Sequence, residues 1–378
     1  MKTIVLMDSF KGSLTSEEAG NAVKEGILTA DETAEVLVYP FADGGEGTLD
    51  AFLKADKDSR RIRTEVSDPL GRRINACYGV LKDDTIVVEI AQAAGLCLLT
   101  DKEKDPLHTT TKGVGELIKH AVGKGYRKFI IALGGSATND CGIGMLKALG
   151  FGISDDKGVP VEDGASGLSG AVSISSADTI PHLMECSFTI ACDVKNPLFG
   201  ENGASHVFAP QKGASLEDVE KMDSWMKDFS ETVKNIYPEA DPFAEGAGAA
   251  GGLGFAFKTF LHGIMEPGAE VLLERTGIEE EISKADLIIT GEGRIDEQTY
   301  MGKAPVRIAQ VAKRYDKPVI AIAGCVGEGA EKCHEAGIDA IFPTVSSPMS
   351  IKEAMEPGTA RENVKRTACE IARLLVRK

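Results

Sequence analysis

Residues 285–303 read ADLIITGEGRIDEQTYMGK, and this stretch decides the fold that we expect. Its first half is an apolar run typical of a buried strand, and its second half is a glycine-rich turn that carries Glu292, Arg294, Asp296 and Lys303. In open α/β sheets, ligands bind beyond the carboxyl ends of the strands. Carboxylates beside a lysine at such a point suit a magnesium nucleotide, because Mg²⁺ is usually held by one or two carboxylates together with phosphate oxygens.

The same order of apolar run, glycine and polar cluster recurs three more times in the chain. The three further examples are 3–7 leading into DSFKGS at 8–13, 35–39 preceding DGGE at 43–46, and 128–133 leading into GGSATND at 134–140. This recurrence predicts parallel strands whose carboxyl ends carry the chemistry of the protein.

Both ends of the chain follow a strand–helix–strand order. Residues 15–18, TSEE, form a capping box that starts a helix between the first two strands, and this order favours parallel pairing. Further elements are expected in the C-terminal part: a helix over 306–315, strands over 319–323 and 340–343, and a closing helix with an apolar stripe at Val364, Ala368, Ile371 and Leu375.

The middle of the chain has a different pattern. Polar and apolar residues alternate over 62–66 and 74–78, and the turn DPLG at 68–71 separates them, which predicts antiparallel strands. A chain of 378 residues also exceeds the usual size of a single core. We therefore predict an α/β protein with a discontinuous, doubly wound parallel-sheet domain of the flavodoxin or Rossmann kind.

The predicted domain boundaries follow from this change of pattern. Residues 1–63 and 284–378 would form the doubly wound domain, residues 64–283 would form an inserted mixed α/β domain, and the active site would lie in the cleft between them. Between 217 and 236 a charged helix is expected, with Val219, Met222, Met226, Phe229 and Val233 as its buried face.

Composition excludes several classes of protein. A net charge of −16 and a sequence pI near 5.0 oppose nucleic-acid binding, because phosphate backbones require basic surface. No apolar run is long enough to span a membrane, and the N-terminal apolar run is too short for a signal peptide. The eight cysteines are scattered singly, which argues against a disulfide framework or a zinc site. We expect a cytoplasmic monomer or small homo-oligomer that acts on a small molecule.

The polar clusters together resemble the type 1 glycerate kinase family. Each string is common by itself, whereas their joint order and spacing across nearly the whole chain are specific. The strings are DSFKGSL at 8–14, ADGGEGT at 42–48, GGSATND at 134–140, ACD at 191–193, NGA at 202–204, GAGAAGG at 246–252 and GEGRID at 291–296. Two positions depart from the family pattern: Met7, where proline is frequent, and Cys141, where glycine is usual.

The resemblance implies ATP-dependent phosphorylation of D-glycerate with Mg²⁺, usually at the 2-hydroxyl. Formation of 3-phosphoglycerate and phosphorylation of a related hydroxy acid stay open, as does a non-catalytic sensor of hydroxy acids. An NAD-dependent oxidoreductase would need a glycine fingerprint directly after the first strand, where DSFKGS stands instead. The P-loop sequence of many nucleotide-binding proteins is also missing.

Residues for binding the nucleotide are expected in two glycine-rich turns. Glycines let the backbone approach a phosphate, and N–H groups at the start of the following helix face it. The candidates are Gly134, Gly135, Ser136, Thr138, Asn139, Gly291, Glu292 and Gly293. The alternative for the first turn is an ordinary strand-to-helix connection in which Ser136, Thr138 or Asn139 caps the helix.

Catalytic residues are expected among the acids and lysines that follow apolar runs. Phosphoryl transfer requires cations near the metal, which favours Lys11 and Lys303, and a base for the substrate hydroxyl, which favours Asp193. Asp43 and Asp296 are the candidate metal ligands. The alternatives are that the lysines are solvated surface charges, and that Asp8 and Asp43 only cap turns.

Two further motifs have weaker interpretations. Three threonines at 109–111 precede a helix, where they could hold a substrate carboxylate or serve as an N-cap. The glycine-rich stretch at 246–251 follows no strand, so it is a poor dinucleotide fingerprint. A close helix–helix contact or a flexible loop near the ligand explains it better.

Overall fold

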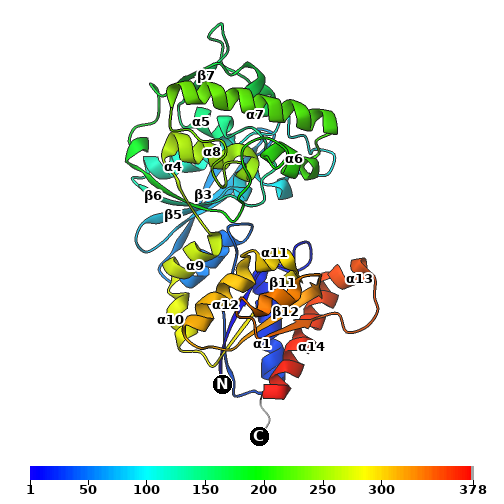
Figure 1. The fold of residues 1–378 in the computed structure, drawn as a ribbon. Coiled ribbons are helices and arrows are strands. Elements are labelled where there is room, and N and C mark those ends of the chain that lie inside the picture. Colours follow the sequence, from blue (N-terminus) through cyan, green and yellow to red (C-terminus); the bar gives the residue numbers. More distant parts are fainter. Residues whose placement is uncertain (376–378) are drawn as a thin grey trace. The chain divides into compact units, whose positions relative to one another are not determined.

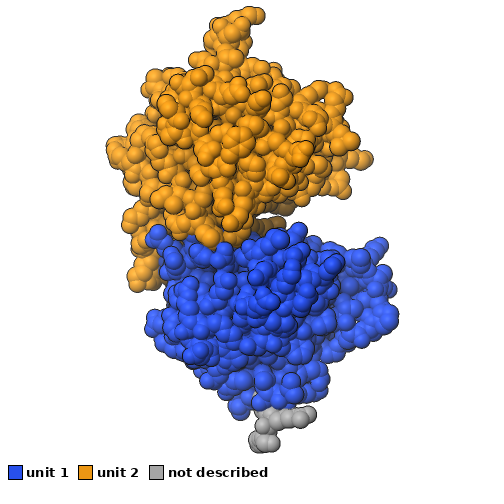
Figure 2. Space-filling view, in the orientation of Figure 1, with its two compact units in different colours: residues 1–43, 50–57, 268–378 blue, residues 44–49, 58–267 orange. Residues whose placement is uncertain are grey.

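The computed structural model describes residues 1–375, which divide into two compact units (Figure 2). Unit 1 consists of residues 1–43, 50–57 and 268 to the end of the described chain, and unit 2 consists of Gly44–Leu49 and Asp58–Pro267. The bounds differ from the expected 1–63, 64–283 and 284–378. The strand that begins at Arg60 pairs within unit 2, and the two helices between 268 and 283 pack within unit 1.

Unit 1 contains a five-stranded sheet in which every neighbouring pair is parallel (Figure 1). The strand order is β13 (Ala340–Pro343), β12 (Val319–Val326), β11 (Leu287–Ile295), β1 (Lys2–Met7) and β2 (Glu35–Val38). The parallel pairing of the first two strands is therefore confirmed. Apolar side chains fill β1 on both faces, as expected for a strand in the middle of a covered sheet.

The longer helices of unit 1, α1 (Ser16–Ala30), α12 (Ala304–Arg314) and α14 (Pro357–Leu375), each bury one face. The shorter helices are α2 (Thr48–Ala55), α9 (Gly268–Thr276), α10 (Ile278–Ser283), α11 (Glu297–Tyr300) and α13 (Ile351–Met355), with a 3-10 turn at Ala330–His334. The capping box at Thr15 and Glu18 is confirmed, and α1 packs beside α14 (Figure 1). In α14 the predicted apolar stripe is buried except at Leu375, which is 44% exposed because it lies in the last turn, beyond the sheet.

Unit 2 contains a six-stranded mixed sheet and a separate pair of short strands. The order is β10 (Ile264–Glu266), β9 (Ser187–Ala191), β6 (Lys128–Ala132), β5 (Thr85–Glu89), β4 (Arg73–Val80) and β3 (Arg60–Ser67), while β7 (Gly152–Ser154) pairs with β8 (Ser173–Ser175). The antiparallel prediction is confirmed for β3, β4 and β5. From β5 to β10 the neighbouring strands are parallel, so their carboxyl ends lie at one edge of the sheet.

The helices of unit 2 pack against this sheet, and a large hydrophobic core lies between the helices and the sheet. Their bounds are α3 (Ala91–Ala94), α4 (Lys112–Gly123), α5 (Ile143–Ala148), α6 (Ala204–Phe208), α7 (Leu216–Ile236) and α8 (Ala249–Leu261), with 3-10 turns at Leu96–Leu98, Ala165–Gly170, Leu183–Glu185 and η4 (Pro210–Lys212). All five predicted core positions of α7 are buried. A kink with left-handed backbone at Ala250, Gly251 and Gly252 interrupts α8.

Candidate active site

The sheet of unit 1 has one point at which the chain order reverses. From β1 the chain moves outward to β2, and from β11 it moves outward in the opposite direction through β12 to β13. The reversal lies between β1 and β11, where Met7 is opposite Gly291. Ligands of open α/β sheets bind beyond the strand ends at such a point. Two carboxylates follow these paired residues directly, at Asp8 and Glu292.

Asp8 is an acid in a buried position, with 4% of its surface exposed. Its backbone N–H donates to the carbonyl oxygen of Gly291 at 2.8 Å, which holds it beside β11. Its Oδ1 accepts a hydrogen bond from the N–H of Ser9 at 2.6 Å. Burial, followed by the neighbouring carboxylates of Asp43 and Glu292, raises the pKa of Asp8 to about 8. Carboxyl groups are therefore concentrated at the switch point, and Asp8 keeps its proton there up to about pH 8.

Glu292 lies near the end of β11 and contacts two residues of the following turn. The hydroxyl of Thr299 donates to Oε1 at 2.7 Å, and the ammonium of Lys303 lies 3.5 Å from Oε2. Burial raises the pKa of Glu292, and these two partners act in the opposite direction. The structure thus brings the predicted residues Glu292 and Lys303 together. Sequence reasoning missed Thr299, which is buried in α11 and has no motif of its own.

Asp296 has a structural role that the sequence did not indicate. It caps α11, because its Oδ1 accepts the N–H of Gln298 at 3.0 Å, and its Oδ2 accepts the Nε–H of Arg294 at 2.7 Å. Burial acts to raise the pKa of Asp296, but the hydrogen bonds from Arg294 and Gln298 hold it below its ordinary value. Both carboxylate oxygens thus already have partners within the protein.

The remaining predicted residues of unit 1 act on the same acids. Lys11 is exposed in the tight loop that follows β1, and its charge lowers the pKa of Asp8. The carboxylate of Asp43 raises the pKa of both Asp8 and Glu292. One electrostatic cluster at the strand ends of unit 1 therefore contains Asp8, Lys11, Asp43, Glu292 and Lys303.

The residues of this cluster fit a magnesium ion that arrives with a nucleotide. Within residues 1–375, no group of three or more His, Cys, Asp or Glu side chains has the arrangement of a metal site. A nucleotide-bound Mg²⁺ needs only one or two carboxylates, because phosphate oxygens and water supply its other ligands. The mutual repulsion of Asp8, Asp43 and Glu292 is the kind of strain that a divalent cation relieves.

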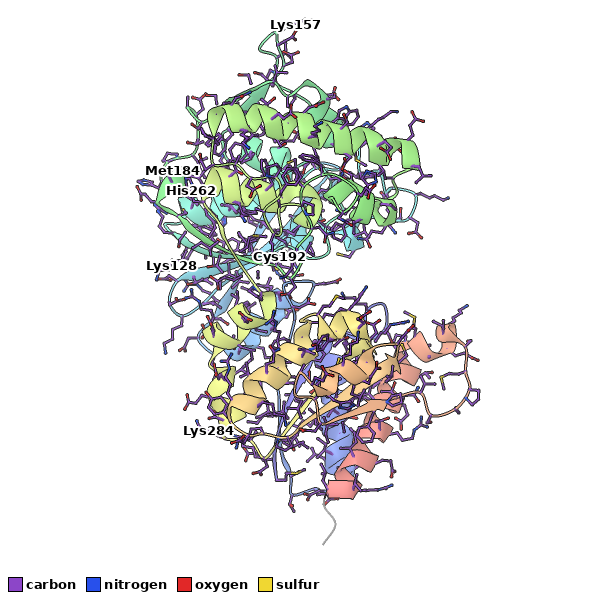
Figure 3. All side chains as sticks on the ribbon, in the orientation of Figure 1. Lys128, Lys157, Met184, Cys192, His262 and Lys284 are labelled. Carbon is purple, nitrogen blue, oxygen red and sulfur yellow. The ribbon has the colours of Figure 1, made fainter. Side chains whose placement is uncertain are left out.

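In unit 2, three of the parallel strands end in polar or glycine residues at one edge of the sheet. Glu89 ends β5, Gly134 follows β6 after one residue, and Asp193 follows β9 after Cys192, which Figure 3 labels. Because Ala132 of β6 pairs with Ala191 of β9, the segments that contain Gly134 and Asp193 leave the sheet side by side. Asp193 is partly buried there.

The DGGEG segment passes from unit 1 into unit 2 between Asp43 and Gly44. In unit 2 it packs against the strand ends, since the N–H of Gly134 donates to the carbonyl oxygen of Gly44 at 2.9 Å. A Cβ atom at Gly134 would collide with the backbone of Gly45, so only glycine allows this approach. Glu89 accepts the N–H groups of residues 47 and 49, at 3.2 and 3.1 Å, at the start of α2.

The loop 134–140 is exposed at its glycine end and buried at its polar end. Gly135 is exposed and Gly134 is partly exposed, whereas Thr138 and Asn139 have no exposed surface. The loop is held by many hydrogen bonds: Ala137 donates to Ala94 O at 2.8 Å, for example, and its carbonyl accepts from the Thr109 hydroxyl at 2.9 Å. The backbone of the two glycines is therefore the part that can touch a ligand.

The N-cap alternative for Ser136, Thr138 and Asn139 is wrong. The carboxylate of Asp140 accepts the N–H of Gly142 at 3.1 Å and that of Gly144 at 3.3 Å, which satisfies the start of α5. It also accepts the N–H and the hydroxyl of Thr111, both at 2.9 Å. Burial raises the pKa of Asp140, and these four donors act in the opposite direction.

The threonines at 109–111 have partners within the protein. The hydroxyls of Thr109 and Thr111 contact the loop 134–140, and the hydroxyl of Thr110 accepts the N–H of Lys112 at 3.2 Å. Thr111 occupies the N-cap position of α4 without a side-chain cap. The hydroxyls of Thr109 and Thr111 therefore fix the loop 134–140, and the side chain of the N-cap residue Thr111 does not cap α4.

The glycine-rich stretch 246–252 makes a close backbone contact with residues 138–141, which form a loop and not the expected second helix. The carbonyl oxygen of Gly251 accepts the N–H of Cys141 at 2.9 Å, and a Cβ atom at Gly251 would collide with the carbonyl of Thr138. Cys141 itself has φ of +51°, in the left-handed region that favours glycine. This conformation explains why glycine is usual at the position where the chain departs from the family pattern.

Lys212 is the residue of this site that sequence reasoning missed. It ends η4, it is 2% exposed, and its ammonium donates to Ser136 Oγ at 2.9 Å and to the carbonyl oxygen of Thr138 at 2.7 Å. Lys212 precedes Gly213, but no predicted strand leads into it. The pattern that indicates Lys11 and Lys303, an apolar run before the lysine, is therefore missing at Lys212.

The architecture and these strand ends define the class of protein. Parallel strands that end in glycine turns, buried carboxylates and lysines are what an ATP-dependent kinase needs to hold phosphates and neutralise their charge. No described helix is both long and apolar enough to cross a lipid bilayer.

Comparison with known proteins gives the particular family. Residues 3–376 match the model of the glycerate kinase family. The chain is 40% identical to glycerate 2-kinase of Escherichia coli over 376 residues, covering 99% of this chain and 98% of the other, and 43% identical to glycerate kinase of Bacillus cereus over 373 residues, covering 98% and 97%. A crystal structure named glycerate kinase 2, from Salmonella typhimurium, has a TM-score of 0.83 and 40% identity, covering 99% and 98%.

The chain therefore belongs to the glycerate kinase family, and the resemblance seen in its motifs is confirmed. As a member of this family it is an ATP-dependent kinase, with ATP as the phosphate donor.

Proposed function

We propose that this protein transfers the γ-phosphoryl group of ATP to D-glycerate and forms 2-phosphoglycerate, with Mg²⁺. The observation that carries this proposal is the pair of buried carboxylates, Asp8 and Glu292, at the switch point of the unit 1 sheet, with Lys303 beside them. In an open parallel sheet, ligands bind at the point where the strand order reverses, and this supports placing the nucleotide there. The name glycerate 2-kinase of one relative supports the 2-position.

In this proposal the cluster in unit 1 serves the nucleotide. Asp43 is the first candidate for a metal ligand, and Asp8 adds charge beside it. Asp296 would reach a metal only by releasing Arg294. A bound Mg²⁺ would neutralise charge on the phosphates and polarise the γ-phosphoryl group.

The other residues of unit 1 bind the phosphates. The backbone of residues 291–293 would approach them, with Glu292 holding Lys303 in place through the contact described above. Lys303 and Lys11 would neutralise charge on the transferred group.

The strand ends of unit 2 would serve phosphate binding and proton transfer. The exposed glycines Gly134 and Gly135 offer backbone that a phosphate or carboxylate can approach, and Ser136, Thr138 and Asn139 shape the loop behind them. Asp193 is the proposed base that takes the proton from the substrate hydroxyl, in the segment that leaves the sheet beside Gly134.

The proposal is tested by measuring ADP release with D-glycerate, with L-glycerate and with no acid, each with and without Mg²⁺. We expect turnover only with D-glycerate and Mg²⁺, and phosphorus NMR should identify 2-phosphoglycerate. A 3-phosphoglycerate signal would correct the position and leave the kinase assignment intact. No glycerate-dependent turnover would reject the proposed substrate, and binding of hydroxy acids without turnover would favour the sensor. The cytoplasmic location and the monomer or small homo-oligomer stay predictions.

A further inference from the structure

Lys212 is a buried lysine whose charge has no carboxylate as its hydrogen-bond partner. Its two acceptors are a hydroxyl, Ser136 Oγ, and a backbone carbonyl, that of Thr138. Both belong to the loop 134–140, which lies more than 70 residues earlier in the chain. Lysine is almost never fully buried unless it is paired, so this arrangement needs a reason.

Keeping an ammonium in this position costs free energy. Burial lowers the pKa of Lys212 to about 7, and the negative charge of Asp140 offsets part of that effect. Asp140 is fully buried and is held by four hydrogen bonds from Thr111, Gly142 and Gly144. Replacement by an apolar side chain of similar length would remove this cost, so a purely structural role does not account for the charge.

The loop that Lys212 supports is itself strained. Thr138 Oγ1 and Asn139 Oδ1 are buried without a hydrogen-bond partner, and burying such unpaired groups destabilises the folded loop. The next residue after the loop, Cys141, has a left-handed backbone that is unfavourable for any residue except glycine. The loop therefore does not hold its shape through its own contacts alone.

Lys212 contacts the loop from its buried side. Ser136 and Thr138 alternate with Ala137, whose carbonyl is held by Thr109, so three successive residues are tied to neighbouring elements. The exposed part, Gly134 and Gly135, immediately precedes these three residues. Movement of Ser136 would therefore move the backbone that we have proposed for binding a phosphate or carboxylate.

We propose that Lys212 is a positioning residue for phosphoryl transfer, which sets the conformation of the loop 134–140 through its bonds to Ser136 Oγ and Thr138 O. It acts through the loop and does not touch the substrate. This inference rests on the proposed role of the loop in binding the substrates.

The first test replaces Lys212 with methionine, which keeps the length of the side chain and removes the charge. We expect kcat to fall by about tenfold to a hundredfold, the loss that small displacements of reacting groups produce, with circular dichroism unchanged. Lys221→Met is the matched control, because Lys221 is an exposed lysine of α7 whose partner is Glu217. The control should keep the wild-type kcat. A folded Lys212→Met enzyme with wild-type kcat would overturn the inference.

The second test separates positioning from a direct effect of the hydroxyl. Ser136→Ala should lower kcat less than Lys212→Met does, and the double variant should be no worse than Lys212→Met alone, because the serine acts through the lysine. Effects that simply multiply would contradict the inference. If Lys212→Met fails to fold, Lys212→Arg replaces it, because arginine keeps the positive charge and changes the geometry of the two hydrogen bonds. A reduced kcat in folded Lys212→Arg supports positioning. Wild-type kcat with unchanged hydrogen exchange over the loop contradicts it.

A third measurement does not depend on the substrate. Amide hydrogen exchange of the protein without ligands should become faster over residues 134–142 in Lys212→Met and stay unchanged in Lys221→Met. If wild type phosphorylates no glycerate, the proposed function fails while this measurement still decides the role of Lys212. Unchanged exchange over the loop in Lys212→Met would overturn the positioning role even in an active enzyme.

Discussion

The strand ends of unit 1 and the loop 134–140 of unit 2 solve opposite electrostatic problems. In unit 1, burial raises the pKa of Asp8 and of Glu292, and the carboxylate of Asp43 acts in the same direction on both. In unit 2, the buried carboxylate of Asp140 is surrounded by four donors, and the positive charge of Lys212 acts on it. One region gathers carboxyl groups that raise the pKa of Asp8, and in the other region the carboxylate of Asp140 is satisfied by hydrogen bonds from neighbouring segments.

The difference indicates two kinds of ligand site. Carboxylates that repel one another gain free energy when a cation binds, so unit 1 is prepared for a metal with its phosphates. A loop held by hydrogen bonds to neighbouring elements, among them those from Thr109 and Lys212, offers a backbone of defined shape, so unit 2 is prepared to orient an anionic group at little cost in entropy.

The largest effect is expected at Asp193, which belongs to neither pattern because its proposed role is proton transfer. Asp193→Asn should lower kcat about 10²- to 10⁴-fold, since a general base typically contributes that much, while the KM for ATP changes little. Steady-state kinetics against both substrates would measure this. The control is Asp228→Asn, at an exposed acid of α7. A kcat within a factor of about three of wild type would remove Asp193 from the mechanism.

A smaller effect is expected when unit 1 loses part of its negative charge. Asp43→Asn should increase the Mg²⁺ concentration required for half-maximal activity by about tenfold or more, because one carboxylate ligand is lost. Titration of activity with Mg²⁺ at saturating ATP would measure it. Asp296→Asn serves as the comparison, because both oxygens of Asp296 already accept hydrogen bonds. An equal shift in both variants would mean that the metal uses Asp296 as well, and no shift in Asp43→Asn would show that Asp43 is not a ligand.

The comparison also predicts a pH-dependent gain in stability from Asp8→Asn. The pKa of Asp8 is raised from 3.8 to about 8, so between these values the native state binds the proton more tightly than the unfolded state and stability falls as pH rises. The variant lacks this loss. Its free energy of unfolding should therefore improve relative to wild type from pH 5 to pH 8, by at most about 1.4 kcal/mol per pH unit.

Urea unfolding at pH 5, 6, 7 and 8, with EDTA and without nucleotide, would measure this difference. Asp31→Asn is a suitable control, because hydrogen bonds from Thr33 lower the pKa of this exposed acid of unit 1. The difference in free energy of unfolding between wild type and Asp8→Asn should change with pH. A constant difference would contradict the raised pKa of Asp8.

The smallest effect is expected for Cys141→Gly in unit 2. Glycine removes the cost of a left-handed backbone at this position, about 1–2 kcal/mol, but it also loses a buried side chain and makes the unfolded chain more flexible. These contributions nearly cancel, so stability should change by less than about 1 kcal/mol and kcat by less than about twofold. Thermal unfolding and steady-state kinetics would measure both. A large loss of activity would show that the thiol has a role beyond packing.

Local patterns predicted the elements well where they depend on near neighbours. The capping box at Thr15, the buried face of α7 and the antiparallel strands β3 to β5 all follow from periodicity and turn residues. The prediction that Leu375 packs with the apolar stripe of α14 was wrong, because a helical stripe predicts which face is apolar and not where the packing surface ends. The GGSATND loop was correctly located, but its polar residues proved to be buried.

The sequence by itself determined the family, the α/β class and the strand ends at which the functional residues lie, because glycines, acids and lysines stand next to apolar runs in the chain. Only the tertiary structure decided which of these residues act on one another. The contact of Lys212 with Ser136, the pairing of Thr299 with Glu292 and the raised pKa of Asp8 depend on distances between segments and on burial. Local spacing in the sequence encodes neither these distances nor this burial, because both arise only when distant segments come together and exclude water.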